Sequence, residues 1–362
     1  MADQFSARKD FFWIAYGDQM RIYACIAVVI LHSAAWVLFF QEKTVAETWS
    51  LNNLLSAACR WCVPVFIMLS GAIFLSRPLP ESASAFLKKR VLRVGIPLLF
   101  WTAVYFAYSH FGKDIKFTLT GALHLFLLGR PYYHLYFLFV MIGLYLITPA
   151  LKFFMPASPA RPRADQIIVI LILTSAVAMM NKYFAIKSAN AFTFFIPFLG
   201  YYLAGAWLQE MKLKPKALAL TWLVFIITVM LTMLEPRILP RIPGIRQPWA
   251  FDQLFVYCNP AVILMSICAF LILSNRPITT EPTGIGVSTR GRILRTVAQT
   301  TFGIYLIHPL ILEISSTFYY LAFPGALPPA LETPALALFT LLVSFSLILP
   351  MLKAPYLKSL IS

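Results

Sequence analysis

The chain has 362 residues, of which 60% are hydrophobic and only 12% are charged. Soluble domains have about 45–50% apolar and about 25% charged residues, so this composition excludes an ordinary soluble fold. The net charge of +16 would suggest nucleic-acid binding in a soluble protein, but here the basic residues lie between apolar segments and report membrane orientation instead.

The apolar residues form runs of 16 or more, close to the length that crosses about 30 Å of hydrocarbon. Helices satisfy their backbone hydrogen bonds internally, so a helical bundle is expected in lipid. We therefore predict an all-α integral membrane protein of about ten transmembrane helices in one membrane domain, 1–362. The expected spans are 21–40, 53–75, 94–110, 134–152, 166–181, 190–208, 217–234, 255–274, 297–315 and 334–352.

The basic residues predict the orientation of these spans. With the N-terminus in the cytoplasm, inside segments hold 20 of the 30 basic residues and outside segments hold 9, while Arg60 lies within the second span. This excess places both termini in the cytoplasm. The same layout gives a cytoplasmic segment at 1–19, a periplasmic loop at 235–254 and a cytoplasmic loop at 275–296. The first apolar run is too long for the core of a signal peptide, so we expect the N-terminus to be retained.

The first span carries an arginine and a histidine. Arg21 and His32 are eleven residues apart, which is three helical turns plus about 20°, so they share a face and differ in depth by roughly 16 Å. An imidazole can act as a base at neutral pH. The alternative is a histidine hydrogen-bonded to a neighbouring helix and an arginine that snorkels to the interface.

The second span contains Cys59 and Cys62 at the C-x-x-C spacing of redox motifs. The pair lies in an apolar segment without a βαβ pattern, so buried free thiols are the favoured interpretation. We expect no metal site.

At the inner end of the third span, Arg90 and Arg93 are three positions apart. Two guanidinium groups on one helix face can bind phosphates bidentately. A cluster of basic residues that anchors the span on the cytoplasmic side would look the same.

Two further histidines lie farther along. His134 follows two tyrosines at the outer start of the fourth span, where aromatic residues are common at interfaces. The apolar stretch 117–130 just before it is too short for a full crossing and is expected to be interfacial or re-entrant. His308 lies in the middle of the ninth span, and the following Pro309 lacks a backbone donor and so frees a carbonyl group.

Other features narrow the class of function. Acidic residues are nearly absent from the spans, which argues against a proton-relay pump. No internal repeat supports an inverted-repeat transporter. The loop 235–254 is rich in proline and arginine, and it either lines the mouth of a site for an acidic or sugar substrate or is a stiff connector.

The ordered motifs resemble those of the acyltransferase-3 family of integral membrane proteins. Its R-x10-H signature resembles Arg21 and His32, with Asp18 three residues earlier. Further matches are VPVFIMLSG at 63–71, which includes Ser70, RVLR at 90–93, HLYFL at 134–138 with Tyr136 in place of the usual tryptophan, and TFGIYLIH at 301–308. The resemblance runs in order over nearly the whole chain.

This resemblance implies acyl transfer, most often acetyl transfer, from cytoplasmic acyl-CoA to a hydroxyl of a surface or lipid-linked glycan in a bacterial inner membrane. By the same resemblance, His32 is the base or acyl-handling residue and Arg21 supports it. Arg90 and Arg93 hold the phosphates of acetyl-CoA. Tyr305, His308 and Ser70 are expected to shape the acceptor side, and Asp18 and His134 to play supporting roles.

A permease or flippase for a lipid-linked sugar is the alternative, since it would use the same polar cavity and basic faces. Consumption of the thioester separates the two, because a flippase releases no CoA. A purely structural scaffold has no need of a histidine and an arginine on one face of a span.

Overall fold

The computed structural model describes residues 2–40, 46–76, 82–154, 164–183, 189–238, 253–276 and 289–361. Within these ranges the chain is helical and contains no strand. Contacts divide it into two compact units. The first unit comprises Met1–Phe66, Lys212–Ile226 and Cys268–Ser362, and the second comprises Ile67–Met211 and Ile227–Ile267.

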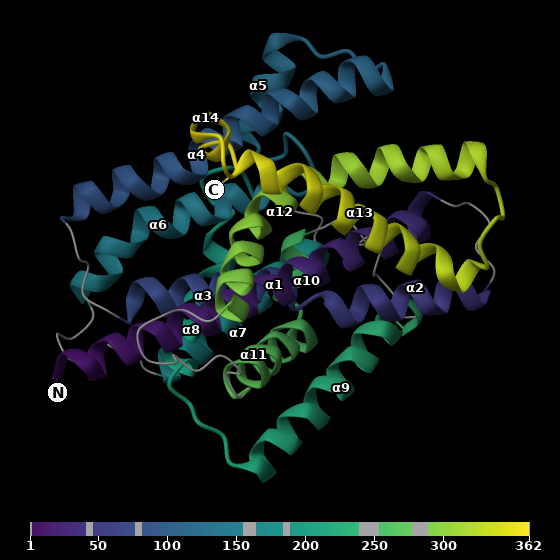
Figure 1. Ribbon diagram of the computed structural model, residues 1–362. Helices are drawn as coiled ribbons and strands as arrows, with labels where there is room; N and C mark the ends of the chain where they lie inside the picture. The colour runs from purple at the N-terminus through teal and green to yellow at the C-terminus, as the bar shows by residue number, and fades with distance from the viewer. Residues whose placement is uncertain are drawn as a thin grey trace. The chain divides into compact units, whose positions relative to one another are not determined.

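The helices follow one another along the chain and are labelled in Figure 1. They are α1 (Ala2–Phe40), α2 (Ala46–Cys59), α3 (Cys62–Leu75), α4 (Ala83–Ala107), the π-helical turn η1 (Tyr108–Gly112), α5 (Leu119–Leu127), α6 (Tyr136–Phe154), α7 (Ala164–Tyr183), the short 3-10 helix η2 (Ile196–Phe198), α8 (Leu199–Leu208), α9 (Pro215–Ile238), α10 (Gln253–Cys258), α11 (Pro260–Ser274), α12 (Thr289–Ala322), α13 (Pro329–Met351) and α14 (Pro355–Lys358).

Eight described helical segments are long and apolar enough to cross a membrane, which confirms an all-α multi-pass membrane protein. They coincide with eight of the ten predicted spans. The other two predicted spans, 190–208 and 255–274, contain the shorter apolar helices Ile196–Leu208 and Pro260–Ser274. The exact number of crossings and the side of each terminus remain predictions.

Three segments between the predicted spans, 117–130, 235–254 and 275–296, are described by the structure to different extents. Helix α5 has nine residues, a rise of about 14 Å, which is less than the thickness of the hydrocarbon layer. Of the predicted loop 235–254, residues 239–252 lie outside the described residues, as do residues 277–288 of the predicted loop 275–296.

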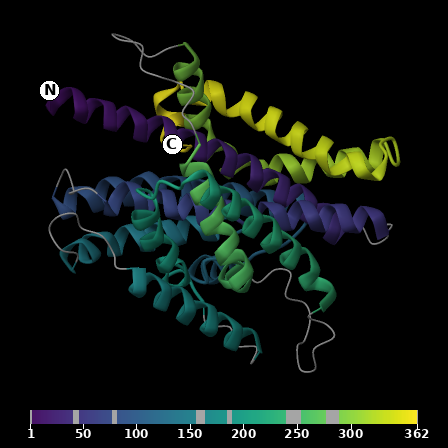
Figure 2. The ribbon, with the colours of Figure 1, turned by 90° about the horizontal axis from the view of Figure 1, so that it is seen from below.

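In the first unit, α1 packs against α2, α12 and α13. Helices α12 and α13 lie side by side in both views, in yellow-green and yellow (Figures 1 and 2). Val37 of α1, Leu312 of α12 and Leu336 of α13 form one buried cluster, with Trp36 packed against it. This cluster joins the three helices and fixes how α1 and α12 face each other.

In the second unit, α4 packs against α6, and α7 packs against α8. The part of α3 in this unit approaches α8 so closely that glycines are required. A Cβ on Gly71 would overlap the carbonyl oxygen of Tyr202, and one on Gly205 would overlap the carbonyl oxygen of Met68. Small residues allow membrane helices to pack backbone against backbone in this way.

Candidate functional site

A pair of histidines lies where α1 meets α12 in the first unit. Nδ1 of His32 is 2.7 Å from Nε2 of His308. The two rings are nearly parallel, with an angle of 13° between their planes. His308 is fully buried, whereas His32 is partly exposed. The pair therefore has one enclosed ring and one partly exposed ring.

The enclosed ring is held by its own helix. Nδ1 of His308 lies 2.7 Å from the carbonyl oxygen of Tyr305 and 3.1 Å from that of Ile304. The Tyr305 ring is buried and packs near the His308 ring, with centroids 5.8 Å apart. Tyr305 thus contacts the histidine pair through both its carbonyl group and its ring.

Toward its N-terminus, the same face of α1 carries an ion pair. Nη1 of Arg21 donates to Oδ1 of Asp18 at 2.8 Å. The Asp18 side chain is 8% exposed and that of Arg21 is 39% exposed, so the carboxylate is enclosed while the guanidinium group reaches outward. Arg295 of α12 is close enough to Asp18 to interact electrostatically with it. The first unit therefore holds an arginine–carboxylate group roughly 16 Å along α1 from the histidine pair.

The two arginines of α4, in the second unit, have different surroundings. The Arg90 guanidinium carbon lies 4.7 Å from the centre of the Phe74 ring and 5.8 Å from that of Phe86. Its Nε is buried and has no hydrogen-bond partner among the described residues. Arg93 is exposed. Arg90 is thus a guanidinium group held against aromatic rings with an N–H that can still donate.

The other predicted residues of the second unit lie apart from Arg90 in the sequence. Ser70 is half-buried in α3. His134 is buried beside Tyr105, Tyr132 and Tyr133, with ring centroids 5.0, 5.9 and 5.6 Å away. The arrangement is an aromatic cluster around one histidine.

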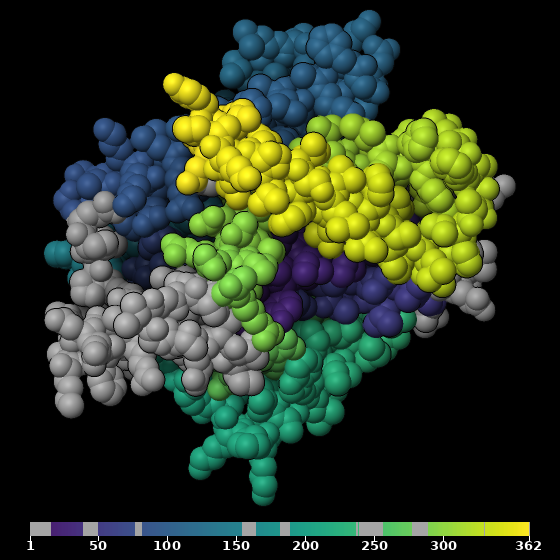
Figure 3. Space-filling model, viewed as in Figure 1, coloured from purple at the N-terminus to yellow at the C-terminus, as the bar shows by residue number. Residues whose placement is uncertain are grey.

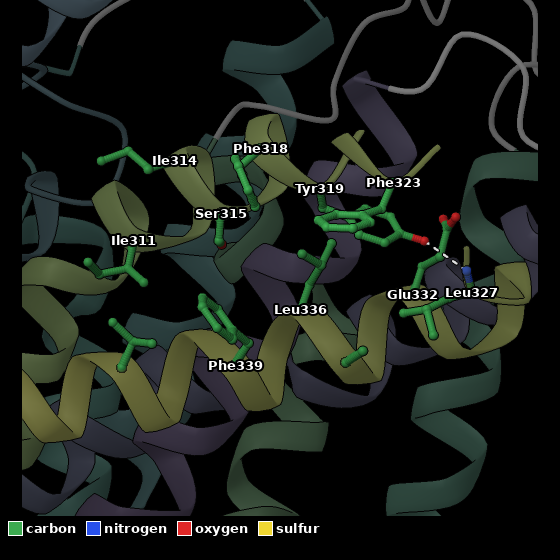
Figure 4. Close-up of a pocket in the computed structure, with 12 residues that line it drawn as sticks. Ile311, Ile314, Ser315, Phe318, Tyr319, Phe323, Leu327, Glu332, Leu336 and Phe339 are labelled. Carbon is green, nitrogen blue, oxygen red and sulfur yellow. Dashed lines mark hydrogen bonds between the residues drawn. The ribbon is translucent and has the colours of Figure 1, made fainter. Parts of the chain in front are cut away.

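An apolar cavity of about 570 Å³ lies between α12 and α13 of the first unit. In Figure 3 the two helices form neighbouring ridges on the visible face. Figure 4 shows Ile311 and Phe318 of α12 facing Leu336 and Phe339 of α13, with Glu332 near one end. The cavity begins three residues after His308, but neither histidine lines it.

The cysteines and the possible metal ligands are the other groups to consider. All five cysteines, including Cys59 and Cys62, are buried thiols that form no disulfide bond. In the part of the chain that the structure describes, no group of three or more histidine, cysteine, aspartate or glutamate side chains could hold a metal ion.

Sequence reasoning missed several contacts of the predicted residues. Phe86 is four positions before Arg90, so helical spacing could have indicated it. Phe74 lies on another helix and left no such signal. Arg295 is also on a different helix from Asp18, and only the structure brings the two near each other.

Comparison with known protein families identifies the family of this chain. A family model described as an acyltransferase domain, that of the acyltransferase-3 family, matches residues 14–349. No curated protein and no solved structure matches the chain. The matched stretch includes the histidine pair, the Asp18–Arg21 pair and both arginines of α4.

Proposed function

This chain belongs to the acyltransferase-3 family, and from that membership we propose that it moves an acetyl group from cytoplasmic acetyl-CoA to a hydroxyl of a surface or lipid-linked glycan. We place it in a bacterial inner membrane. The observation that carries the proposal is the 2.7 Å contact between Nδ1 of His32 and Nε2 of His308. A partly exposed imidazole oriented by a second polar group is the arrangement of a general base.

In the proposed reaction, Nε2 of His32 removes the proton from the acceptor hydroxyl. The hydroxyl oxygen attacks the thioester carbonyl carbon, the carbon–sulfur bond breaks, and the CoA thiolate takes the proton from His32. The products are the O-acetyl ester and free CoA, and His32 returns to its initial state. Holding both substrates at the same ring would supply much of the acceleration.

Arg21 supports this site in the proposal, with Asp18 as its anchor. The enclosed carboxylate accepts from Arg21 at 2.8 Å and restricts the guanidinium group. A guanidinium group that is partly exposed and held in one direction is suited to binding an anionic substrate group.

For the donor, we propose that Arg90 and Arg93 bind the phosphates of acetyl-CoA. Support comes from the surroundings of Arg90, since its buried Nε–H has no hydrogen-bond partner among the residues that the structure describes, and such a donor fits a phosphate oxygen. The expected result for Arg90→Ala is a higher KM for acetyl-CoA with a smaller change in kcat, measured in membranes that contain the full chain. Arg90→Lys keeps the charge but loses the planar group, so it should recover only part of the affinity.

The proposal is tested in cells that lack the chain and are supplied with wild type, His32→Ala or His124→Gln. Mass spectrometry then measures acetyl groups on the surface polysaccharide, and a thiol assay on their membranes measures CoA release from acetyl-CoA. Loss of a general base lowers the rate by about 10²–10⁴-fold, so His32→Ala should leave almost no acetyl groups. His124 is exposed on α5, and its substitution should change nothing.

Two outcomes would oppose the proposal. Wild-type acetylation by His32→Ala would remove His32 from the mechanism. Wild-type membranes that move a lipid-linked sugar across the bilayer without releasing CoA would instead identify the alternative, a flippase.

A further inference from the structure

Pro309 leaves α12 without one of its backbone donors. In an uninterrupted helix, the N–H of residue 309 would donate to the carbonyl oxygen of Tyr305, four positions earlier. Proline has no N–H, so this carbonyl oxygen needs another donor. Nδ1 of His308 lies 2.7 Å from it and 3.1 Å from the carbonyl oxygen of Ile304. Carbonyl oxygens only accept hydrogen bonds, so Nδ1 of His308 carries the proton.

The proton on Nδ1 determines what the other nitrogen of His308 can do. In a neutral imidazole with Nδ1 protonated, Nε2 holds a lone pair and accepts. The group at Nε2 is Nδ1 of His32, 2.7 Å away. For a hydrogen bond to form there, Nδ1 of His32 must donate. The lone pair of His32 is then on Nε2.

We propose that His308 is a positioning residue that fixes the tautomer of His32, so that Nε2 of His32 is the basic nitrogen. Nδ1 of His32 donates to Nε2 of His308, and Nδ1 of His308 donates to the Tyr305 carbonyl oxygen. That carbonyl oxygen lacks its helical donor because residue 309 is proline. The role of His308 in catalysis rests on the proposed function. The positions of the protons on the two rings do not depend on it.

The same contact acts during proton transfer. When Nε2 of His32 takes the proton from the acceptor hydroxyl, His32 becomes an imidazolium ion, and its Nδ1–H continues to donate to His308. A hydrogen bond from a charged donor is stronger than one between neutral groups. His308 therefore stabilises the charged form of His32 without itself taking up a proton. The reverse arrangement, in which Nε2 of His308 donates, requires a cationic His308 and leaves Nε2 of His32 protonated and unable to act as a base.

The proton positions can be measured directly. The full chain is produced with ¹⁵N-labelled histidine and placed in lipid nanodiscs, and the ring nitrogens of its five histidines are assigned from single substitutions. Protonated and unprotonated ring nitrogens give well-separated ¹⁵N signals. We expect both His32 and His308 to have a protonated Nδ1 and an unprotonated Nε2. A protonated Nε2 on His32 in the wild-type protein would overturn the inference, and this result needs no variant.

Two substitutions test whether His308 is the cause. In His308→Ala, His32 should become a mixture of tautomers. In His308→Gln, the side-chain amide should direct its NH₂ to the Tyr305 carbonyl and its oxygen to His32, which restores the wild-type His32 signals. His124→Gln is the control and should leave the His32 signals unchanged. An unchanged His32 tautomer in His308→Ala would contradict the inference.

Activity provides the second readout. A base held in the wrong tautomer can cost on the order of 10⁴-fold in kcat, so His308→Ala should fall by roughly 10- to 10⁴-fold and His308→Gln should recover most of that loss. The two proposals fail separately. If the tautomers are as expected but His32→Ala leaves acyl transfer unchanged, the proposed catalytic role of His32 fails while the inferred proton positions stand. If His32→Ala abolishes transfer while His308→Ala changes neither tautomer nor rate, only the role of His308 fails.

Discussion

At the scale of single residues, His32 and Arg21 each have an enclosed partner and are themselves partly exposed. His308 is fully buried and the Asp18 side chain is 8% exposed, while the Arg21 side chain is 39% exposed. In the proposed mechanism, the outward residue of each pair meets a substrate. The inner residue is enclosed and acts there by holding its partner.

This asymmetry gives a prediction for the Asp18–Arg21 pair. Arg21→Gln leaves a buried carboxylate without its nearest cation, and losing a partner of a buried polar group costs about 1–3 kcal/mol. Asp18→Asn leaves an arginine that water can reach, so it should cost less. Thermal unfolding of the purified chain in detergent should therefore show a larger fall in midpoint for Arg21→Gln than for Asp18→Asn.

The double variant Asp18→Asn/Arg21→Gln is the control for this pair. Because both charges are removed together, its loss should be smaller than the sum of the single losses. Equal midpoints for the two single variants, or additive losses, would mean that the pair does not couple in this way.

Sequence spacing could predict part of the site at this scale. Arg21 and His32 lie on one helix, so their common face follows from the helical period. His32 and His308 are 276 positions apart, and periodicity within a helix carries no information about which histidine meets which. Pro309 did indicate a carbonyl group without its helical donor, but the sequence could not show that the His308 ring donates to it.

At the scale of helices, α3 and α8 of the second unit depend on glycine. The atoms that a Cβ at Gly71 would overlap belong to the Tyr202 backbone, which cannot rotate away as a side chain could. Overpacking of this kind costs about 1–3 kcal/mol. We expect Gly71→Ala and Gly205→Ala each to lower the midpoint of thermal unfolding.

Gly95 offers a matched control in α4. An added Cβ there meets nothing within 4 Å, and alanine is favoured over glycine inside a helix by about 0.5–1 kcal/mol. Gly95→Ala should therefore leave the midpoint unchanged or raise it. A similar fall for all three variants would indicate a general effect of alanine and contradict the close approach of α3 and α8.

Helix boundaries show what hydropathy can and cannot predict. The span expected at 166–181 corresponds to α7, Ala164–Tyr183, because its apolar stretch and its helix nearly coincide. The span expected at 297–315 lies within α12, Thr289–Ala322, since this helix continues through polar turns that hydropathy does not mark. The span expected at 53–75 is interrupted between α2 and α3 at residues 60–61. Pro64, in the first turn of α3, is the one local signal of a new helix start there.

At the scale of the whole molecule, the distribution of basic residues predicts sidedness. We expect a cysteine at Lys116 to react with a membrane-impermeant maleimide from outside intact cells. A cysteine at Lys214 should react only after the membrane is opened. Both lysines are exposed, and they lie on opposite sides in the predicted layout.

The wild-type chain is the control for this labelling, because its five cysteines are buried and should not react from either side. If the Lys116→Cys variant were labelled only in opened membranes, the segment between the spans 94–110 and 134–152 would lie on the cytoplasmic side, contrary to the prediction.

The positions and order of the eight long apolar helices could be predicted because each apolar stretch is local in sequence. The packing partners of each helix could not. Arg90 and the His32–His308 pair lie in different units, yet the motifs that contain them look equally regular in the sequence. Nothing in a local motif states which helix its side chains will contact.

Arg21 and His32 are eleven residues apart on an unbroken α1, so the helix itself sets the angular phase between them. Each inserted residue turns everything after it by about 100° and moves it by about 1.5 Å. One extra residue between them would turn either His32 away from His308 or the Asp18–Arg21 pair away from Arg295, with every side chain of the site still present. Seven extra residues would restore the direction to within about 20° but add about 10 Å. The length of this stretch is therefore constrained even where the identities of its side chains are not.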